Sequence, residues 1–252
     1  MTLQKALTLT LVLISLSLPL ALPASDSSGT VLITGANRGI GLALAEKFRD
    51  SGYDVIGTAR NPEKAGDLNA LDVRVEQLDV TDPASVSALA QRIDGLALDI
   101  VVNNAGIKGH ETRELADLDI EKLHLTLDVN SLGPLRVIQA LFPNVRAGER
   151  KVFANISSMM GSMEMNTWGC CLGYRASKSA LNSLTKTLSV NYKDDGMVFV
   201  TMHPGYVQTD MNDGQGNITT EQSAEGLFNV ISSLTADDNG KYYDWQGKEL
   251  PW

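Results

Sequence analysis

The stretch VLITGANRGIGLALAEKFRD, residues 31–50, predicts the first strand, turn and helix of a parallel α/β sheet. Residues 31–34 form a short apolar run typical of a buried strand. Ile40, Leu44 and Phe48 then recur at helical spacing and share one face. A strand that turns directly into an amphipathic helix is the repeating unit of a sheet covered by helices.

The turn itself contains Gly35, Gly39 and Gly41. Gly35 permits a tight turn, Gly39 allows a pyrophosphate to approach the backbone, and Gly41 allows the helix to pack close to the strand. The first N–H groups of a helix have no partner within it, so the turn is a predicted anion site. The alternative is a tight turn without a ligand. The predicted binding residues of this turn are Gly35, Asn37, Arg38, Gly39, Ile40 and Gly41.

The same alternation continues to the end of the chain. It predicts an α/β fold: a single Rossmann-type doubly wound sheet of about seven parallel strands, with helices on both faces, over residues 29–252. A ligand crevice is then expected at the carboxyl ends of the strands. Further strands are predicted over residues 53–58, 73–78, 99–103, 151–156, 197–203 and 241–244, and later helices over residues 120–141, 174–192 and 221–234.

Composition excludes several classes of protein. The chain has 252 residues and a formal net charge of -9, which argues against a nucleic-acid partner because phosphate binding needs clustered Lys and Arg. Its three histidines show no metal-ligand spacing, so no metal is predicted. Its two cysteines, Cys170 and Cys171, are adjacent, and neighbours do not easily reach ordinary disulfide geometry, so no disulfide is predicted.

Residues 1–28 are interpreted as a leader. Residues 6–22 are largely apolar, follow Lys5 and precede a polar segment, as in a secretory signal or a short membrane anchor. This run is near the lower limit for crossing a bilayer, which favours the signal over the anchor. A wrongly assigned start codon is the alternative. A real leader predicts the secretory pathway, the periplasm or membrane association, and otherwise the location is cytoplasmic.

The ends of the second and third predicted strands bear on the cofactor. NAD recognition calls for a carboxylate after the second strand, but Arg60 stands there instead. Arg60 and Arg38 could meet a 2′-phosphate through bidentate contacts, which favours NADP(H), with NAD(H) as the less favoured cofactor. Both arginines could equally be solvated surface residues. Asp79 and Val80 close the third strand, where an adenine edge would lie.

Tyr174 and Lys178 stand four residues apart in a predicted helix and therefore share a face. A free phenol titrates at about 10, and a cation beside it draws the pKa toward neutrality, where the group can exchange protons. Alone, this pair is common on solvated helices.

The motifs together resemble the short-chain dehydrogenase/reductase family over residues 30–252. The resemblance rests on the glycine turn, the Asn103-Asn104-Ala105-Gly106 segment, Asn130, Ser157-Ser158, Tyr174-x-x-x-Lys178 and Pro204-Gly205, in that order. Residues 203–211 and 238–252 are closest to sniffer-type carbonyl reductases and C-factor-like signalling proteins.

The resemblance implies a role for each matched residue. Tyr174 would be the general acid/base, Lys178 would bind the nicotinamide ribose and lower the tyrosine pKa, and Ser158 would hold the substrate oxygen. Asn130 would bind a water that links Lys178 to solvent. The remaining implied cofactor contacts are Asn103, Ala105, Gly106, Pro204, Gly205, Val207 and Thr209. Locally, Ser158 and Asn130 could each only cap a turn, and Asn103 could only close a strand.

These motifs predict an NADP(H)-dependent oxidoreductase that transfers a hydride between nicotinamide and a carbonyl or alcohol group of a small substrate. The alternative is a C-factor-like dinucleotide-binding signalling module with incidental turnover. Residues 159–173, longer here than in many members, carry Met159, Met160, Met163, Met165 and Trp168, which could line an apolar pocket or only pack under a loop. The resemblance also implies a homodimer or homotetramer formed through residues 120–141 and 174–192, with a monomer as the alternative.

Overall fold

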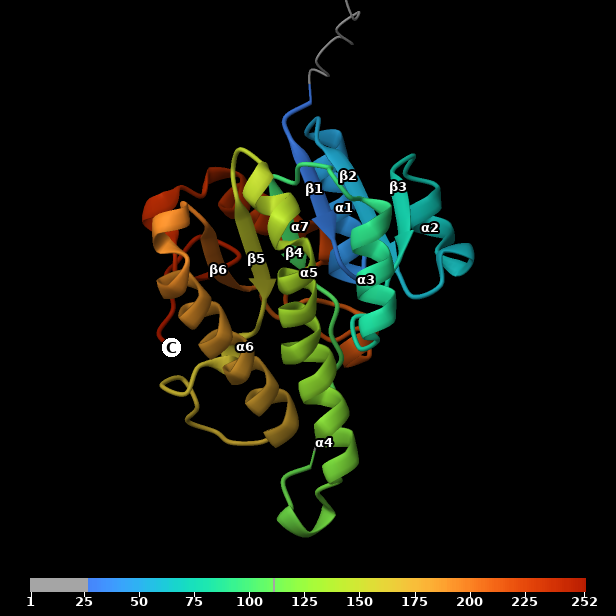
Figure 1. Cartoon of the computed structure of the whole chain (residues 1–252). Helices are drawn as coiled ribbons and strands as arrows, with labels where there is room; N and C mark the ends of the chain where they lie inside the picture. Colours follow the sequence, from blue (N-terminus) through green and yellow to red (C-terminus); the bar gives the residue numbers. More distant parts are fainter. Residues whose placement is uncertain (1–26, 111) are drawn as a thin grey trace, which may run out of the picture.

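Seven short segments of the chain form one parallel sheet in the computed structural model, which describes residues 27–110 and 112–252 (Figure 1). Each strand pairs in parallel with its neighbours, in the order β3-β2-β1-β4-β5-β6-β7. The fold class predicted from the sequence is therefore confirmed. The strands are β1 Thr30–Ile33, β2 Asp54–Ala59, β3 Arg74–Gln77, β4 Ile100–Asn103, β5 Val152–Ile156, β6 Val198–His203 and β7 Tyr242–Asp244.

The order of the strands places the ligand edge. The chain begins in the middle of the sheet at β1, moves outward to β3, and then returns to β4 before moving outward to β7. The connections after β1 and β4 therefore leave in opposite directions, and a crevice opens between them at the carboxyl ends of these strands. The central strands β1 and β4 are almost entirely buried, as expected for strands covered on both faces.

Two apolar cores lie on opposite faces of the sheet. On one face, α1 packs against α7, and Phe48, Tyr53 and Phe228 meet edge to face. On the other, α3, α5 and α6 cover Phe153 and Phe199, whose rings stack at 5.3 Å. The α-helices are α1 Gly39–Asp50, α2 Gly66–Asn69, α3 Pro83–Arg92, α4 Ile120–Leu127, α5 Gly133–Ala147, α6 Leu172–Asn191 and α7 Thr220–Ser233.

The long helix predicted over residues 120–141 is confirmed in position, but it is interrupted by a π-helical turn and continues to Ala147. A π-helical turn, Asp128–Leu132, separates α4 from α5, and the Gly133 N–H donates to the carbonyl of Asp128, five residues back. Pro134 follows and has no N–H, so the regular ladder of i to i−4 bonds cannot continue through it. In Figure 1, α4 and the loop before it project beyond the body of the sheet.

The predicted leader falls mostly outside the described part of the chain. Residues 27 and 28 are described, and Ser28 N donates to the carbonyl of Gly52 at 2.8 Å. Among residues 27–110 and 112–252, none of the helices combines the length and the apolar character that crossing a bilayer requires. The leader and the location that it would imply stay predictions.

Candidate active site

A cleft of about 1240 Å³ lies along the carboxyl ends of the strands. We call the part lined by the glycine turn, Arg60 and Asp79 the cofactor half, and the part lined by Ser158 and Tyr174 the substrate half. Most predicted site residues line this cleft: Gly35, Asn37, Arg38, Gly39, Ile40, Arg60, Asp79, Val80, Ala105, Gly106, Ser158, Tyr174, Lys178, Pro204, Gly205, Val207 and Thr209. Gly41, Asn103 and Asn130 do not.

The glycine turn leaves room that side chains would fill. Gly35 and Gly39 have φ angles of 65° and 57°, in the left-handed region that glycine enters freely. A Cβ at Gly41 would collide with the carbonyl of Gly35 and lie 2.5 Å from the Asn104 amide nitrogen. No side chain caps the start of α1. The open helix end and the close backbone packing fit the pyrophosphate of a dinucleotide.

Hydrogen bonds in both directions join the loop after β1 to the loop after β4. The Thr34 hydroxyl accepts the backbone N–H groups of Asn104 and Ala105, both at 3.0 Å. The Asn104 amide donates to the carbonyls of Thr34 and Gly35 at 3.0 and 3.1 Å. These contacts fix the separation of the two loops, so hydrogen bonds between side chains and backbone groups at neighbouring strand ends set the floor of the cofactor half.

Arg60 and Asp79 lie at the outer end of the cofactor half. Arg60 is exposed in the cleft at the carboxyl end of β2. The Asp79 carboxylate accepts the hydroxyl and backbone N–H of Thr81, at 2.7 and 2.9 Å. The Thr81 hydroxyl is the main cause that lowers the Asp79 pKa, and the positive charge of Arg60 contributes. A cationic group therefore stands where NAD-specific sites carry an acid.

Arg38 points across the mouth of the cleft. Its guanidinium meets the Asp210 carboxylate at 3.1 Å, and both side chains are largely exposed. A solvated pair of this kind contributes about 0–1 kcal/mol. Near it, a Cβ at Gly39 would meet the Thr209 methyl at 3.8 Å, so the glycine turn and the loop after β6 face each other closely.

Asn103 and Asn130 hold the scaffold. The Asn103 amide donates to Asn155 on the neighbouring strand at 2.8 Å, and its side chain is buried away from the cleft. Asn130, in the π-helical turn, pairs with both backbone groups of Ile107 at 2.8 Å and donates to Ser177 at 3.0 Å. Both amide hydrogens of Asn130 are thereby used, so its side chain could bind the predicted water only through the second lone pair of Oδ1, which already accepts the Ile107 N–H.

Tyr174 and Lys178 lie in the first turns of α6 and both line the cleft. The Lys178 ammonium is buried, donates to the carbonyl of Ile156 at 2.8 Å, and lies 5.8 Å from the centre of the Tyr174 ring. Burial lowers the Lys178 pKa to about 8. Its remaining donors can serve a ligand, and the cation stands close enough to stabilise negative charge on the phenol oxygen.

Ser158 follows β5 and is largely buried at the cleft. Its hydroxyl accepts the backbone N–H of Met160 at 3.2 Å, so it does cap the short helix Met159–Gly161. The capping role does not consume its donor hydrogen. The neighbouring Ser157 instead donates its hydroxyl hydrogen to Asn182 at 2.6 Å. Ser158 is therefore the better placed of the two serines to donate to a substrate oxygen.

The insert between Ser158 and Tyr174 lines the cleft with one of its methionines, Met160. Met163 is 77% exposed and Trp168 is 44% exposed, so the apolar-pocket interpretation does not extend to them. The Trp168 ring instead stacks on the Arg175 guanidinium at 4.6 Å. Leu125, Tyr206 and Met211 also line the cleft, and the sequence analysis assigned none of them to a substrate pocket.

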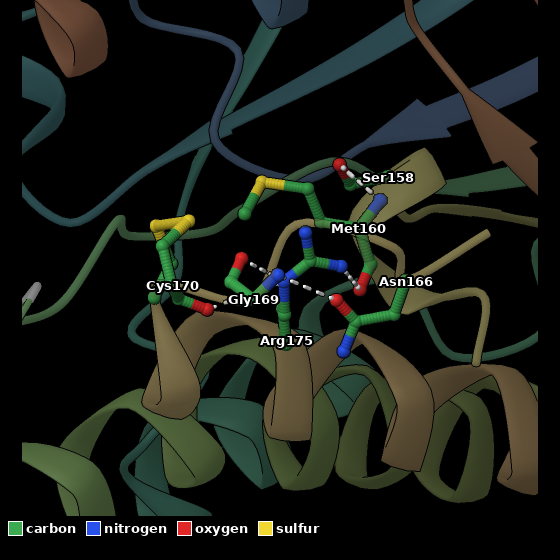
Figure 2. Close-up of a disulfide and its surroundings, with 7 residues drawn as sticks. Ser158, Met160, Asn166, Gly169, Cys170 and Arg175 are labelled. Carbon is green, nitrogen blue, oxygen red and sulfur yellow. Dashed lines mark hydrogen bonds between the residues drawn. A yellow bond between two sulfur atoms is a disulfide. The ribbon is translucent and has the colours of Figure 1, made fainter. Parts of the chain in front are cut away.

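The prediction of no disulfide is wrong. Cys170 and Cys171 are bonded to each other, and both adopt left-handed backbone conformations, with φ angles of 68° and 57°. Sequence neighbours reach the bond because the chain turns sharply here into α6. Figure 2 shows Arg175 between this loop and Met160. Its guanidinium donates to the carbonyls of Gly169, Cys170 and Met160 at 3.1, 3.2 and 3.3 Å.

The comparisons with known proteins agree with this geometry. Residues 29–218 match the family model described as short chain dehydrogenase. The C-signal protein of Myxococcus xanthus is 39% identical over 155 residues, which cover 62% of this chain and 93% of the relative.

Two solved structures share the whole architecture. Carbonyl reductase Sniffer of D. melanogaster is 30% identical with a TM-score of 0.85, over 89% of this chain and 99% of that one. An NADPH-bound carbonyl reductase from chicken fatty liver is 32% identical with a TM-score of 0.82, over 90% and 100%. With this sheet, this cleft and these relatives, the chain belongs to the short-chain dehydrogenase/reductase family of oxidoreductases and is similar to its sniffer-type carbonyl reductases.

Proposed function

We propose that this protein is an NADP(H)-dependent oxidoreductase that interconverts a carbonyl group and an alcohol on a small substrate. The observation that carries the proposal is the placement of Ser158, Tyr174 and Lys178 in one cleft with the glycine turn. The solved relative described as NADPH-bound carbonyl reductase supports the same chemistry.

Each side chain has a separate task in this proposal. When bound, a nicotinamide dinucleotide supplies or accepts the hydride. Tyr174 donates its phenol proton to the substrate oxygen during reduction and takes it back during oxidation. Ser158 donates a hydrogen bond to the same oxygen. Lys178, fixed on the carbonyl of Ile156, stabilises the negative charge that develops on the Tyr174 oxygen.

The choice of NADP(H) rests on Arg60. It stands at the end of β2 in the cofactor half, and its positive charge helps to lower the pKa of Asp79. Its guanidinium can bind a 2′-phosphate in a bidentate manner, whereas an acidic side chain in this position would repel the phosphate. The apolar side chains of Met160, Leu125 and Met211 favour a substrate that is itself fairly apolar.

The test is turnover by the full-length chain with NADPH and a panel of aldehydes, ketones and quinones, followed both by NADPH absorbance and by detection of the alcohol product. Tyr174→Phe should lower kcat by about 100-fold or more, because only the transferable proton is lost. Tyr192→Phe is the matched control, since Tyr192 lies just beyond the far end of α6 and its ring packs on Phe142. Equal rates for Tyr174→Phe and wild type would refute the proposal.

A signalling role with incidental turnover is the second candidate, favoured by the similarity to C-signal. The two functions separate through the same variant. If signalling is the selected role, Tyr174→Phe will retain its activity in a cell-based developmental signalling assay while losing reductase activity. Loss of both activities together would favour the reductase.

A further inference from the structure

Tyr242 is the largest fully buried side chain of the described chain, and it lies on β7 at the edge of the sheet. Its hydroxyl donates to the carbonyl oxygen of Ser158 at 2.5 Å. A phenol without a partner in such a place would lose its hydrogen bonds to water without compensation. Burial raises the Tyr242 pKa, so the group keeps its proton and remains a donor.

The Ser158 carbonyl oxygen accepts two hydrogen bonds. Besides Tyr242, it accepts the backbone N–H of Gly161 at 2.7 Å. Two donors occupy the two lone pairs of this oxygen, which fixes the plane of the peptide that follows Ser158. The same peptide leads into the turn that carries Met160, whose side chain lines the substrate half.

A second contact from the same region supports the next segment. The rings of Tyr242 and Trp252 lie 5.4 Å apart. The backbone oxygen of Trp252 accepts the Ser162 hydroxyl at 3.1 Å and the Glu164 N–H at 3.2 Å. The segment from Tyr242 to Trp252 therefore holds the reacting serine at one point and the start of the insert at another.

The two residues before Ser158 are held by a different element. Lys178 donates to the carbonyl of Ile156, and Ser157 donates to Asn182, with both partners on α6. After Ser158, α6 also holds Met160 and Gly161, whose carbonyls accept from Arg175 and Ser179. The Ser158 carbonyl is instead held by Tyr242 on β7. The orientation of Ser158 relative to Tyr174 thus depends on a hydrogen bond from a strand with no cleft residue of its own.

We infer that Tyr242 is a positioning residue, which through its hydrogen bond to the Ser158 carbonyl orients the Ser158 hydroxyl toward the oxygen that Tyr174 protonates. The inference rests on the proposed reductase function. Catalytic groups need their geometry held closely, and a displacement of about 1 Å can cost a large factor in rate. The hydrogen bond and the ring contact of the Tyr242 side chain in the described chain are with Ser158 and Trp252, neither of which belongs to the cofactor half, so the affinity for NADPH should not change.

The experiment compares two neighbours on one strand. Tyr242→Phe removes the hydroxyl and keeps the ring. Tyr243→Phe is the matched control, because its hydroxyl donates to Asp238 at 2.6 Å, away from the cleft. We expect Tyr242→Phe to lower kcat by about tenfold with an unchanged Kd for NADPH, whereas Tyr243→Phe keeps kcat within about twofold. Equal kcat values in the two variants would overturn the inference.

A double-mutant cycle shows whether the effect passes through the serine. In a Ser158→Ala background, Tyr242→Phe should change kcat by less than about twofold, because the hydroxyl to be oriented is gone. An undiminished tenfold effect in that background would mean that Tyr242 acts elsewhere, and the inference would be wrong.

Hydrogen exchange gives a readout that needs no turnover. The Gly161 N–H shares its acceptor with Tyr242, so Tyr242→Phe should speed exchange over residues 159–164, and Tyr243→Phe should not. Unchanged exchange in Tyr242→Phe would refute the positioning role. If the wild-type chain reduces no carbonyl compound but this exchange pattern is found, the proposed function fails while the structural role of Tyr242 stands.

Discussion

The cofactor half and the substrate half of the cleft are built in different ways. In the cofactor half, hydrogen bonds join the ends of two neighbouring strands, as in the contacts of Thr34 with Asn104. In the substrate half, backbone carbonyls are held by side chains from other elements, as that of Ser158 is by Tyr242 on β7 and that of Met160 is by Arg175 on α6. Changes far from any motif should therefore impair turnover while cofactor affinity is preserved.

The largest effect is expected from Lys178, where the two halves meet. Lys178→Met should lower kcat by about 100-fold or more, because charge on the tyrosine oxygen is no longer stabilised. Lys186→Met is the control, since it lies two turns along the same helix and donates only to the carbonyl of Gly240. A rate for Lys178→Met close to wild type would remove the lysine from the mechanism.

The same residue makes a pH-dependent prediction. Burial lowers the Lys178 pKa from 10.5 to about 8, so between these values the unfolded chain binds more protons than the folded one. The free energy of unfolding should therefore rise with pH across this window because of Lys178. Over the same window the folded protein loses the charged form of Lys178, so turnover should fall. Denaturant unfolding at pH 8 to 10 should show this contribution in wild type and a smaller slope in Lys178→Met.

The next largest effect is expected on the free energy of unfolding in acid. It should come from His203, just before the loop that faces the glycine turn. His203 is buried at the end of β6, and burial lowers its pKa from 6.5 to about 4 although Asp244 opposes the shift. The unfolded chain holds the extra proton between these values, so stability falls as pH falls from 6.5 to 4, by on the order of 3 kcal/mol. Urea unfolding should show this loss, and His203→Gln should flatten it. An identical acid slope in the variant would contradict the assignment.

A smaller and selective effect is expected in the cofactor half. Arg60→Gln should weaken NADPH binding by about tenfold, which corresponds to about 1.4 kcal/mol, by removing one charge-assisted contact. NADH affinity and kcat at saturating cofactor should stay the same, because the substrate half is untouched. Titration calorimetry with both cofactors measures the ratio. A parallel loss for NADH would mean that Arg60 does not read the 2′-phosphate.

The smallest effect is expected from the disulfide. Replacing Cys170 and Cys171 together by Ser loosens the loop whose carbonyls hold Arg175, so the KM of the carbonyl substrate should rise by roughly two- to threefold with kcat unchanged. Treating wild type with a dithiol reductant, which converts the disulfide to two thiols, should reproduce this rise. The reductant should have no effect on the double variant, and a response there would place its action elsewhere.

The sequence was sufficient for the fold and for most of the residues that line the cofactor half. Strand and helix periodicity places Gly35 and Arg60 at strand ends, and the topology then brings those ends together. The π-helical turn was missed because Pro134 sits inside a continuous apolar pattern, which hides the break. The disulfide was missed because left-handed conformations at Cys170 and Cys171 follow from the path of the loop rather than from their neighbours.

Tyr242 was missed for a different reason. A single Tyr on a short edge strand carries no local sign that its hydroxyl will reach a carbonyl 84 residues earlier in the chain. Similarly, the family resemblance implied a cofactor contact for Asn103, but strand alternation directs its side chain to Asn155. Contacts between side chains from distant segments depend on packing, which periodicity does not encode.

In the ion pair between Arg38 and Asp210, the carboxylate of Asp210 competes with a bound phosphate for the Arg38 guanidinium. Asp210 engages only one terminal nitrogen of Arg38, so a phosphate that takes both terminal nitrogens must displace this carboxylate, and Arg38 then contributes the difference between two ion pairs. Exposed side chains change rotamer within picoseconds to nanoseconds, far faster than an enzyme turns over. The ion pair across the mouth therefore weakens the binding of a phosphate to Arg38 at equilibrium without slowing its entry.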